Sequence, residues 1–276
     1  MLHPCPENAL LDRDNGKGTN IVNDLFSVKD KIALVTGGGA GIGRMIAEGL
    51  VEAGAKTYIS SRKADVIAQA AEELSRNGGT CIAIEADLST EEGCTKLADD
   101  LKSREDRLHI LVNNAGNTWG APLEEYPDAA FDRCYALNIK GVFYTTVKLL
   151  PLLRKAASDD NPARVINIGS IDGIQAPIVD NYAYSATKAG VHHMTRVLAH
   201  KLAPDRITVN AVAPGPFDTK MMHETLERVG DQIKALCPLG RIGRPEDMAG
   251  IAIYLSSRAG AYLTGALIPV DGGITT

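Results

Sequence analysis

The chain has 276 residues, and its 29 lysines and arginines against 34 aspartates and glutamates give a formal net charge of −5. A mildly acidic chain without a dense basic face argues against a nucleic-acid partner, and the lack of an apolar run of ~20 residues argues against a membrane partner. Its five cysteines are scattered without a Cys-x-x-Cys pair, so we predict no metal site, no disulfide scaffold and reduced thiols in a cytoplasmic protein.

The first segment, residues 1–24, is polar and contains Asn and Gly, and it lacks the apolar stretch of a signal peptide. We predict that it is a mobile extension that precedes a single folded domain over residues 25–276. Its composition does not indicate what the extension does.

From Lys29 onward, short runs rich in β-branched residues alternate with longer segments that carry apolar residues at helical spacing. The predicted strands are 32–36, 56–60, 80–86, 109–113, 164–169, 207–212 and 267–270. The predicted helices are 42–53, 64–76, 91–103, 128–154, 182–202 and 245–256. Strand runs such as IALVT and INIGS are apolar with little alternation, as expected when helices cover both faces of a parallel sheet. We therefore predict the α/β fold class, with one doubly wound domain built on a seven-stranded parallel sheet.

A glycine cluster follows the first strand directly and leads into a helix, with the sequence TGGGAGIG from Thr36 to Gly43. Gly37 and Gly39 permit a tight turn and the close approach of a pyrophosphate. Gly41, Ile42 and Gly43 open the helix, whose N-terminal amides favour negative charge. The spacing also fits a purely structural turn, but its position after a strand favours a dinucleotide site.

Ser61 and Arg62 follow the second predicted strand, about twenty residues beyond Gly41, where an NAD-binding fold normally carries an acidic residue. Arg62 can pair with a 2′-phosphate and Ser61 can donate a hydrogen bond to it, which favours NADP(H) as the cofactor. The alternative is that Arg62 is an ordinary solvated residue at the start of a helix.

Two further segments fall at carboxyl ends of predicted strands, where ligands of open α/β sheets bind. In the first, the Asp87 carboxylate can accept from the adenine amino group, with Leu88 beside it. The second is Asn113-Asn114-Ala115-Gly116, in which the small residues allow backbone contact with the nucleotide. The two asparagines could equally satisfy backbone groups of the loop.

Ser170 ends the fifth strand, and Tyr184 and Lys188 follow at i and i+4 near the start of a helix. This spacing puts both side chains on one helix face, so a nearby positive charge would lower the pKa of the Tyr184 phenol and make it a general acid or base. The Ser170 hydroxyl can donate to a carbonyl oxygen. A Tyr and a Lys four apart also occur on ordinary helices, so the pattern gains its meaning only with the serine and the glycine loop.

The chain resembles the short-chain dehydrogenase/reductase family over about residues 25–276. The resemblance rests on four motifs in this order: TGGGAGIG, NNAG, the set of Ser170, Tyr184 and Lys188, and PGPFDT. The resemblance implies that Lys188 also binds the nicotinamide ribose and that Asn138 holds a water in a proton relay. It further implies a homotetramer and a nicotinamide carboxamide site, the latter formed by Pro214, Gly215, Phe217 and Thr219. Ala40 stands where NADP-preferring members often carry a basic residue, so cofactor selectivity depends mainly on Arg62.

The stretch 217–239 has apolar residues at helical spacing after Met221 and Met222. It is either a lid over an apolar substrate pocket or an amphipathic helix that packs on the domain, and Trp119 is a further candidate pocket wall. The chain also resembles 3-oxoacyl-acyl-carrier-protein reductases, which implies a small-molecule carbonyl substrate such as a 3-oxoacyl thioester. The alternatives are a polyol or sugar dehydrogenase and a non-catalytic NADP(H)-sensing module.

Overall fold

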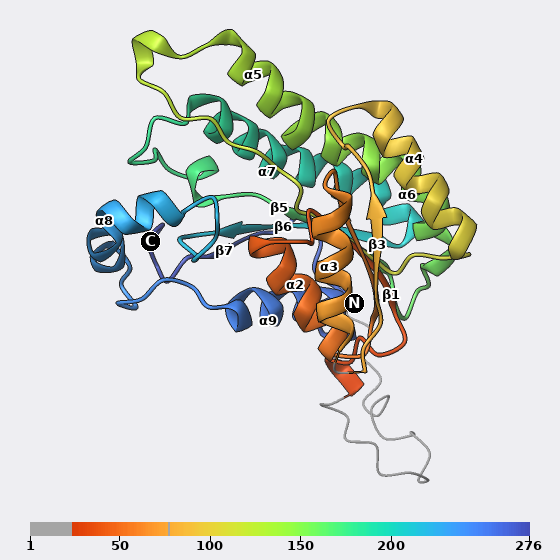
Figure 1. Cartoon of the computed structure of the whole chain (residues 1–276). Helices are drawn as coiled ribbons and strands as arrows, with labels where there is room; N and C mark the ends of the chain where they lie inside the picture. Colours follow the sequence, from red (N-terminus) through yellow and green to blue (C-terminus); the bar gives the residue numbers. More distant parts are fainter. Residues whose placement is uncertain (1–23, 77) are drawn as a thin grey trace, which may run out of the picture.

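A parallel sheet of seven strands runs through the centre of the molecule (Figure 1). The structure is a computed structural model that describes residues 24–276 except residue 77, so the predicted mobile extension lies outside the described residues. The strand order is β3-β2-β1-β4-β5-β6-β7. The strands are β1 Ile32–Thr36, β2 Lys56–Ser61, β3 Cys81–Glu85, β4 Ile110–Asn113, β5 Ala163–Ile168, β6 Ile207–Pro214 and β7 Leu267–Val270.

The order of the strands reverses at the centre of the sheet. β1 pairs in parallel with both β2 and β4, and the chain then adds β5, β6 and β7 on the far side of β4. A parallel doubly wound sheet opens a crevice at the carboxyl ends of its strands where the order reverses, and ligands of such folds bind there. The topology therefore indicates where to look for the functional site.

Helices cover both faces of the sheet and bury one apolar cluster on each. The helices are α2 Gly41–Glu52, α3 Ala64–Ser75, α4 Glu91–Arg104, α5 Asp128–Tyr135, α6 Val142–Ala156, α7 Tyr182–Leu202, α8 His223–Leu236 and α9 Pro245–Ser256. One cluster packs α2, α3 and α9 against the sheet, for example through Ile46, Ile67 and Met248. The other packs α4, α6 and α7 through residues such as Leu101 and Leu149. Figure 1 shows α2 and α9 below the sheet and α5 and α7 above it.

The predicted helix 128–154 is interrupted, and this is the main difference from the sequence interpretation. A π-helical turn, η2 Ala136–Gly141, separates α5 from α6. Gly141 lies so close to the segment after β3 that a Cβ there would come within 2.6 Å of the Leu88 carbonyl oxygen. Asn138, on the same turn, bonds to the backbone of Asn117. The helix is thus interrupted where it contacts other segments of the chain, and the local sequence pattern does not show such contacts.

The predicted fold class is confirmed, with strand ends that differ by one or two residues. β2 continues to Ser61 and β6 to Pro214. Cys81, Cys94, Cys134 and Cys237 are buried free thiols. Across residues 24–276 without residue 77, no helix combines the length and the apolar character that crossing a bilayer requires.

Candidate active site

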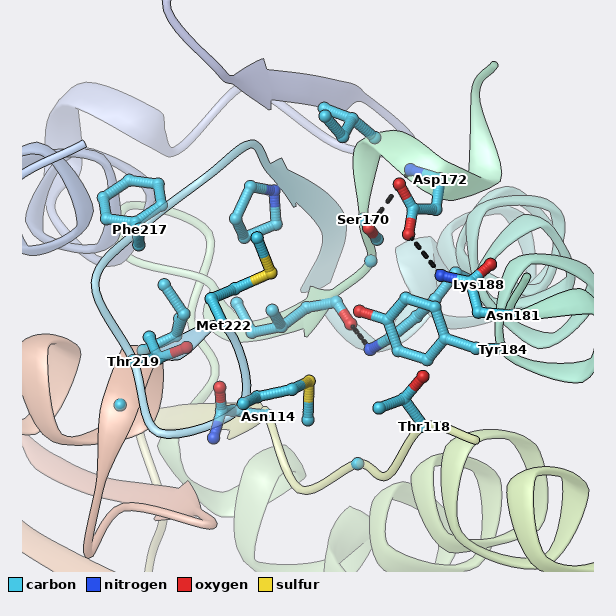
Figure 2. Close-up of a pocket in the computed structure, with 18 of the residues that line it drawn as sticks. Asn114, Thr118, Ser170, Asp172, Asn181, Tyr184, Lys188, Phe217, Thr219 and Met222 are labelled. Carbon is cyan, nitrogen blue, oxygen red and sulfur yellow. Dashed lines mark hydrogen bonds between the residues drawn. The ribbon is translucent and has the colours of Figure 1, made fainter. Parts of the chain in front are cut away.

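A cavity of about 850 Å³ follows the carboxyl ends of the strands, from the turn after β1 to α8 (Figure 2). Most of the residues that the sequence predicts for the site line this cavity: Gly37, Gly41, Ile42, Ser61, Arg62, Asp87, Leu88, Asn114, Ala115, Gly116, Ser170, Tyr184, Lys188, Pro214, Gly215, Phe217 and Thr219. Gly39, Gly43 and Asn138 lie outside the lining. The structure thus brings residues from distant parts of the chain into one continuous groove.

The glycine turn at one end of the cavity has the geometry of an anion-binding loop. Gly37 and Gly41 have φ of +65° and +53°, a region that L side chains rarely adopt. A Cβ on Gly43 would come within 2.4 Å of the Gly37 carbonyl oxygen, so this glycine lets the helix start against the turn. Within the described residues, no side chain caps the N-terminus of α2 and no acidic residue occupies its first turn. Its free amides and dipole are therefore available to a negatively charged group.

Asn114 braces this turn and does so through its side chain. Its Nδ2 donates to the Thr36 carbonyl oxygen at 2.9 Å, and its backbone N–H donates to the Thr36 hydroxyl at 2.9 Å. These bonds agree with the alternative interpretation, in which Asn114 satisfies backbone groups of the loop. Asn114 also lines the cavity, where a cofactor can contact it.

Polar groups at the ends of β2 and β3 gather beyond the glycine turn. The Ser60 hydroxyl is buried and has no hydrogen-bond partner in the described part of the chain. Arg62 Nη1 lies 3.8 Å from Asp87 Oδ2, and Asp87 Oδ1 accepts from both the N–H and the hydroxyl of Ser89. Partial burial raises the pKa of Asp87, but the Ser89 hydrogen bonds and the Arg62 charge outweigh it and hold this pKa below its ordinary value. Asp87 is therefore an anion that faces Arg62.

At the other end of the cavity, Ser170, Tyr184 and Lys188 lie together as predicted (Figure 2). Ser170 follows β5, and its Oγ accepts from the Asp172 N–H at 3.1 Å, which leaves the Ser170 proton free to point elsewhere. The Ser170 hydroxyl lies close enough to Tyr184 to favour the ionised form of its phenol. Lys188 Nζ donates to the Ile168 carbonyl oxygen at 2.7 Å and lies 5.5 Å from the centroid of the Tyr184 ring.

The pKa of the Tyr184 phenol shifts in the direction opposite to the one that the sequence argument expected. Burial raises the Tyr184 pKa to about 12, although the Ser170 hydroxyl, which can donate to the phenolate, opposes the increase. Burial also lowers the pKa of Lys188 to about 8. A positive charge at Lys188 favours the phenolate, but burial removes water from both groups, and the sequence does not show this burial. In the chain by itself, the phenol therefore keeps its proton at neutral pH.

Asn138 contacts the site from behind the cavity wall. Its Oδ1 accepts from the Asn117 N–H at 2.9 Å, and its Nδ2 donates to Asn117 and Thr187. A Cβ on Gly116 would lie 3.2 Å from Asn138 Oδ1 and 3.6 Å from Lys188 Nζ. The space above Gly116 thus adjoins both polar groups, and a second lone pair of Oδ1 remains there for a donor.

The sequence interpretation missed Asp172 and Asn181, which both line the cavity. Asn181 Nδ2 donates to Asp172 Oδ2 at 2.7 Å, and Asn181 Oδ1 accepts from the Ser185 hydroxyl at 2.6 Å. Burial raises the pKa of Asp172 above its ordinary value. The one signal in the sequence was the position of Asp172 two residues after Ser170, and that spacing alone indicates no contact.

The stretch 217–239 contributes both a wall and a packed helix. Met221 and Met222 precede α8 and line the cavity, as do Ile233 and Leu236 on the helix itself. Ile233 is buried and Leu236 is 56% exposed, so the helix packs on the domain and also borders the mouth. The predicted helix that packs on the domain is therefore present, and the same stretch forms part of the cavity wall. Trp119 does not line the cavity, and its ring lies 5.6 Å from the Arg133 guanidinium instead.

Comparison with known proteins places this site in a family. The family model described as short chain dehydrogenase matches residues 31–230. The chain belongs to the short chain dehydrogenase family. The predicted family is therefore confirmed, and the matched range contains the glycine turn, Ser170, Tyr184 and Lys188.

Several relatives share nearly the whole domain. A rhamnolipids biosynthesis 3-oxoacyl-[acyl-carrier-protein] reductase of Pseudomonas aeruginosa is 50% identical over 250 residues, which cover 90% of this chain and 97% of the relative. A 3-oxoacyl-[acyl-carrier-protein] reductase of Aquifex aeolicus is 35% identical and covers 90% of this chain and 99% of its own. A solved structure described as a Pseudomonas aeruginosa RhlG/NADP active-site complex is 49% identical with a TM-score of 0.89, covering 92% of this chain and 99% of that one.

Proposed function

We propose that this short chain dehydrogenase is an NADPH-dependent ketoreductase that reduces a 3-oxoacyl thioester or a similar ketone to a secondary alcohol. The observation that carries the proposal is the convergence of Ser170, Tyr184 and Lys188 at one end of a cavity whose other end is an anion-binding glycine turn. The names of the two 3-oxoacyl reductases and of the NADP complex among its relatives support the same reaction.

The residues of the groove fit an NADP(H) molecule. The uncapped N-terminus of α2 suits the pyrophosphate, and the unpartnered hydroxyl of buried Ser60 suits a polar group of the ribose end. Arg62 stands at the end of β2, where it can pair with a 2′-phosphate, and Ser61 lies beside it. Bound there, NADPH supplies a hydride to the carbonyl carbon of the substrate.

The side chains at the other end of the cavity manage the oxygen of the carbonyl group. The Ser170 hydroxyl, whose Oγ is held by the Asp172 N–H, donates a hydrogen bond to the carbonyl oxygen. Tyr184, whose pKa of about 12 keeps it protonated, delivers the proton to the oxygen as negative charge develops there. Lys188 stabilises the resulting phenolate, and a water in the space above Gly116, next to Asn138, returns the proton to Tyr184.

The mouth of the cavity is apolar, which suits an acyl chain. Ile178, Met221 and Leu236 line it, and their side chains are 72%, 52% and 56% exposed. Exposed apolar side chains around a pocket mark a surface that an apolar ligand can cover. Met221 and Met222 add flexible side chains that adapt to chains of different length.

The exposed apolar side chains of α5 and α6 support a homotetramer. Phe131, Tyr135, Phe143 and Val147 are exposed on these two neighbouring segments. A second copy of the chain would bury them, and Tyr262 near the C-terminus offers a further exposed aromatic for a second interface.

Use of NADPH and the four buried free thiols support a cytoplasmic enzyme, with residues 25–276 as its catalytic domain and residues 1–24 as an extension.

The test follows the nicotinamide absorbance of the full chain in both directions, with NADPH and 3-oxoacyl thioesters in one arm and NADP⁺ with sugars and polyols in the other. We expect turnover with the thioesters. Tyr184→Phe should reduce kcat by ~10²–10⁴-fold while NADPH binding stays nearly intact, because a general acid is typically worth that factor. Tyr182→Phe, on the same helix but outside the cavity lining, is the matched control. Full turnover by Tyr184→Phe would sink the assignment, and turnover confined to sugars or polyols would replace the substrate class.

A further inference from the structure

His192 touches the turn that carries Ser170 and has no part in the chemistry described above. The Ser170 backbone N–H donates to His192 Nε2 at 3.4 Å, across 22 positions of sequence. His192 lies on α7 and is only 5% exposed. Tyr184, Lys188 and His192 follow one another at i, i+4 and i+8, so one face of this helix carries all three side chains.

The imidazole ring fills a slot between two glycines of the turn. A Cβ on Gly169 would lie 2.1 Å from His192 Nε2, and a Cβ on Gly173 would lie 2.8 Å from His192 Cε1. Both distances are far below any real contact, so a side chain at either position would expel the ring. The chain leaves these two positions bare, and the His192 ring fits directly against the backbone on both sides of Ser170.

The ring is neutral, and this fixes which nitrogen accepts. Burial, together with the charge of Lys188, lowers the His192 pKa to about 4, and a backbone hydrogen bond with Gly173 opposes this. A neutral imidazole has one donor and one acceptor nitrogen. Because Nε2 accepts from Ser170, Nδ1 carries the proton. His192 therefore accepts a hydrogen bond at the start of the turn η3 Ile171–Gly173 and packs against Gly173 at its end.

We propose that His192 is a positioning residue that sets the place of the Ser170 hydroxyl relative to Tyr184. The inference rests on the proposed function, in which Ser170 donates to the substrate carbonyl. Ser170 reaches the cavity from a turn and not from a rigid helix or strand, so its hydroxyl needs a fixed backbone. By anchoring that backbone to α7, which also carries Tyr184, His192 fixes the relative position of the two hydroxyl groups.

The first experiment replaces the ring and measures kcat, KM for the ketone and NADPH affinity separately. His192→Phe keeps a ring in the slot but loses the hydrogen bond from Ser170, and we expect kcat to fall by ~10–100-fold, since a misplacement of ~1 Å costs about 10²-fold. NADPH affinity should not change. His192→Gln, whose amide oxygen can accept from Ser170, should restore most of kcat. His193→Phe and His193→Gln, at the exposed neighbour on α7, are the controls.

The second experiment is a double-mutant cycle with Ser170→Ala. If His192 acts through Ser170, His192→Phe should cost little further kcat in the Ser170→Ala background; a role in general packing would give additive losses and overturn the proposal. Should His192→Phe not fold, His192→Asn takes its place, because its shorter amide does not reach Ser170. Unchanged kcat in His192→Phe alongside a strong loss in Tyr184→Phe would refute the positioning role alone. Unchanged kcat in Tyr184→Phe would refute the proposed function instead.

Discussion

Above neutral pH, the pH dependence of kcat/KM should follow the loss of the Lys188 charge. Burial lowers its pKa to about 8, and the neighbouring Cys134 and Asp172 oppose this by favouring the ammonium. With a pKa of about 8, Lys188 is roughly 90% charged at pH 7 and roughly 10% charged at pH 9. Because the neutral amine cannot stabilise the Tyr184 phenolate, kcat/KM should fall by about tenfold from its plateau to pH 9.

The assay is kcat/KM for the ketone at saturating NADPH, measured from pH 6 to 10, since this ratio reports ionisations of the enzyme before the ketone binds. Asp172→Asn is the diagnostic change. It removes a carboxylate that raises the Lys188 pKa while it keeps the shape of the side chain, so the basic limb should move to lower pH. Asp180→Asn, at an exposed position of the same loop, should leave the limb in place.

Either of two results would refute this reasoning. One is a profile that stays flat from pH 7 to pH 9, which would mean that Lys188 keeps its charge or that its charge does not matter. The other is a limb that moves to higher pH in Asp172→Asn, which would show that the carboxylate does not favour the ammonium. The Tyr184 pKa of about 12 lies beyond this range and does not blur the result.

Three further predictions follow from the site and its surroundings. Arg62→Ala should raise KM for NADPH by about 10–100-fold and leave that for NADH nearly unchanged, because a charge-assisted bond to a 2′-phosphate is worth ~1.5–3 kcal/mol; equal shifts for both cofactors would contradict it. Gly43→Ala should lower the free energy of unfolding by ~1–3 kcal/mol, since its Cβ would lie 2.4 Å from the Gly37 carbonyl oxygen; urea denaturation measures this, and Gly250→Ala, with nothing within 4 Å, should cause no loss. The His192 pKa of about 4 is below its ordinary value, so the neutral ring contributes about 3 kcal/mol to the free energy of unfolding above pH 6.5, and this contribution disappears as pH falls through 4. Between pH 7 and pH 4.5, the free energy of unfolding should therefore fall less in His192→Gln than in the unchanged chain. An equal fall in both would argue against a buried neutral ring.

The sequence by itself determined the parts of this protein that local pattern encodes. Apolar runs without alternation identified every strand of a sheet covered on both faces, and glycines after the first strand identified the turn of an anion site. The spacing of Tyr184 and Lys188 put both on one face of α7 because helix geometry alone decides that. The family motifs then named site residues, most of which line the cavity, before any contact was known.

Only the tertiary structure decided what surrounds these groups. Three features depend on contacts between residues whose spacing in the sequence matches neither a helix nor a strand: the π-helical turn at 136–141, the Asp172–Asn181 bond and the His192 slot between two glycines. The direction of the Tyr184 pKa shift belongs here as well, because desolvation depends on every atom that excludes water and not on one charged neighbour. Local spacing therefore determined which residues share a face, while burial, which the whole fold creates, determined their protonation.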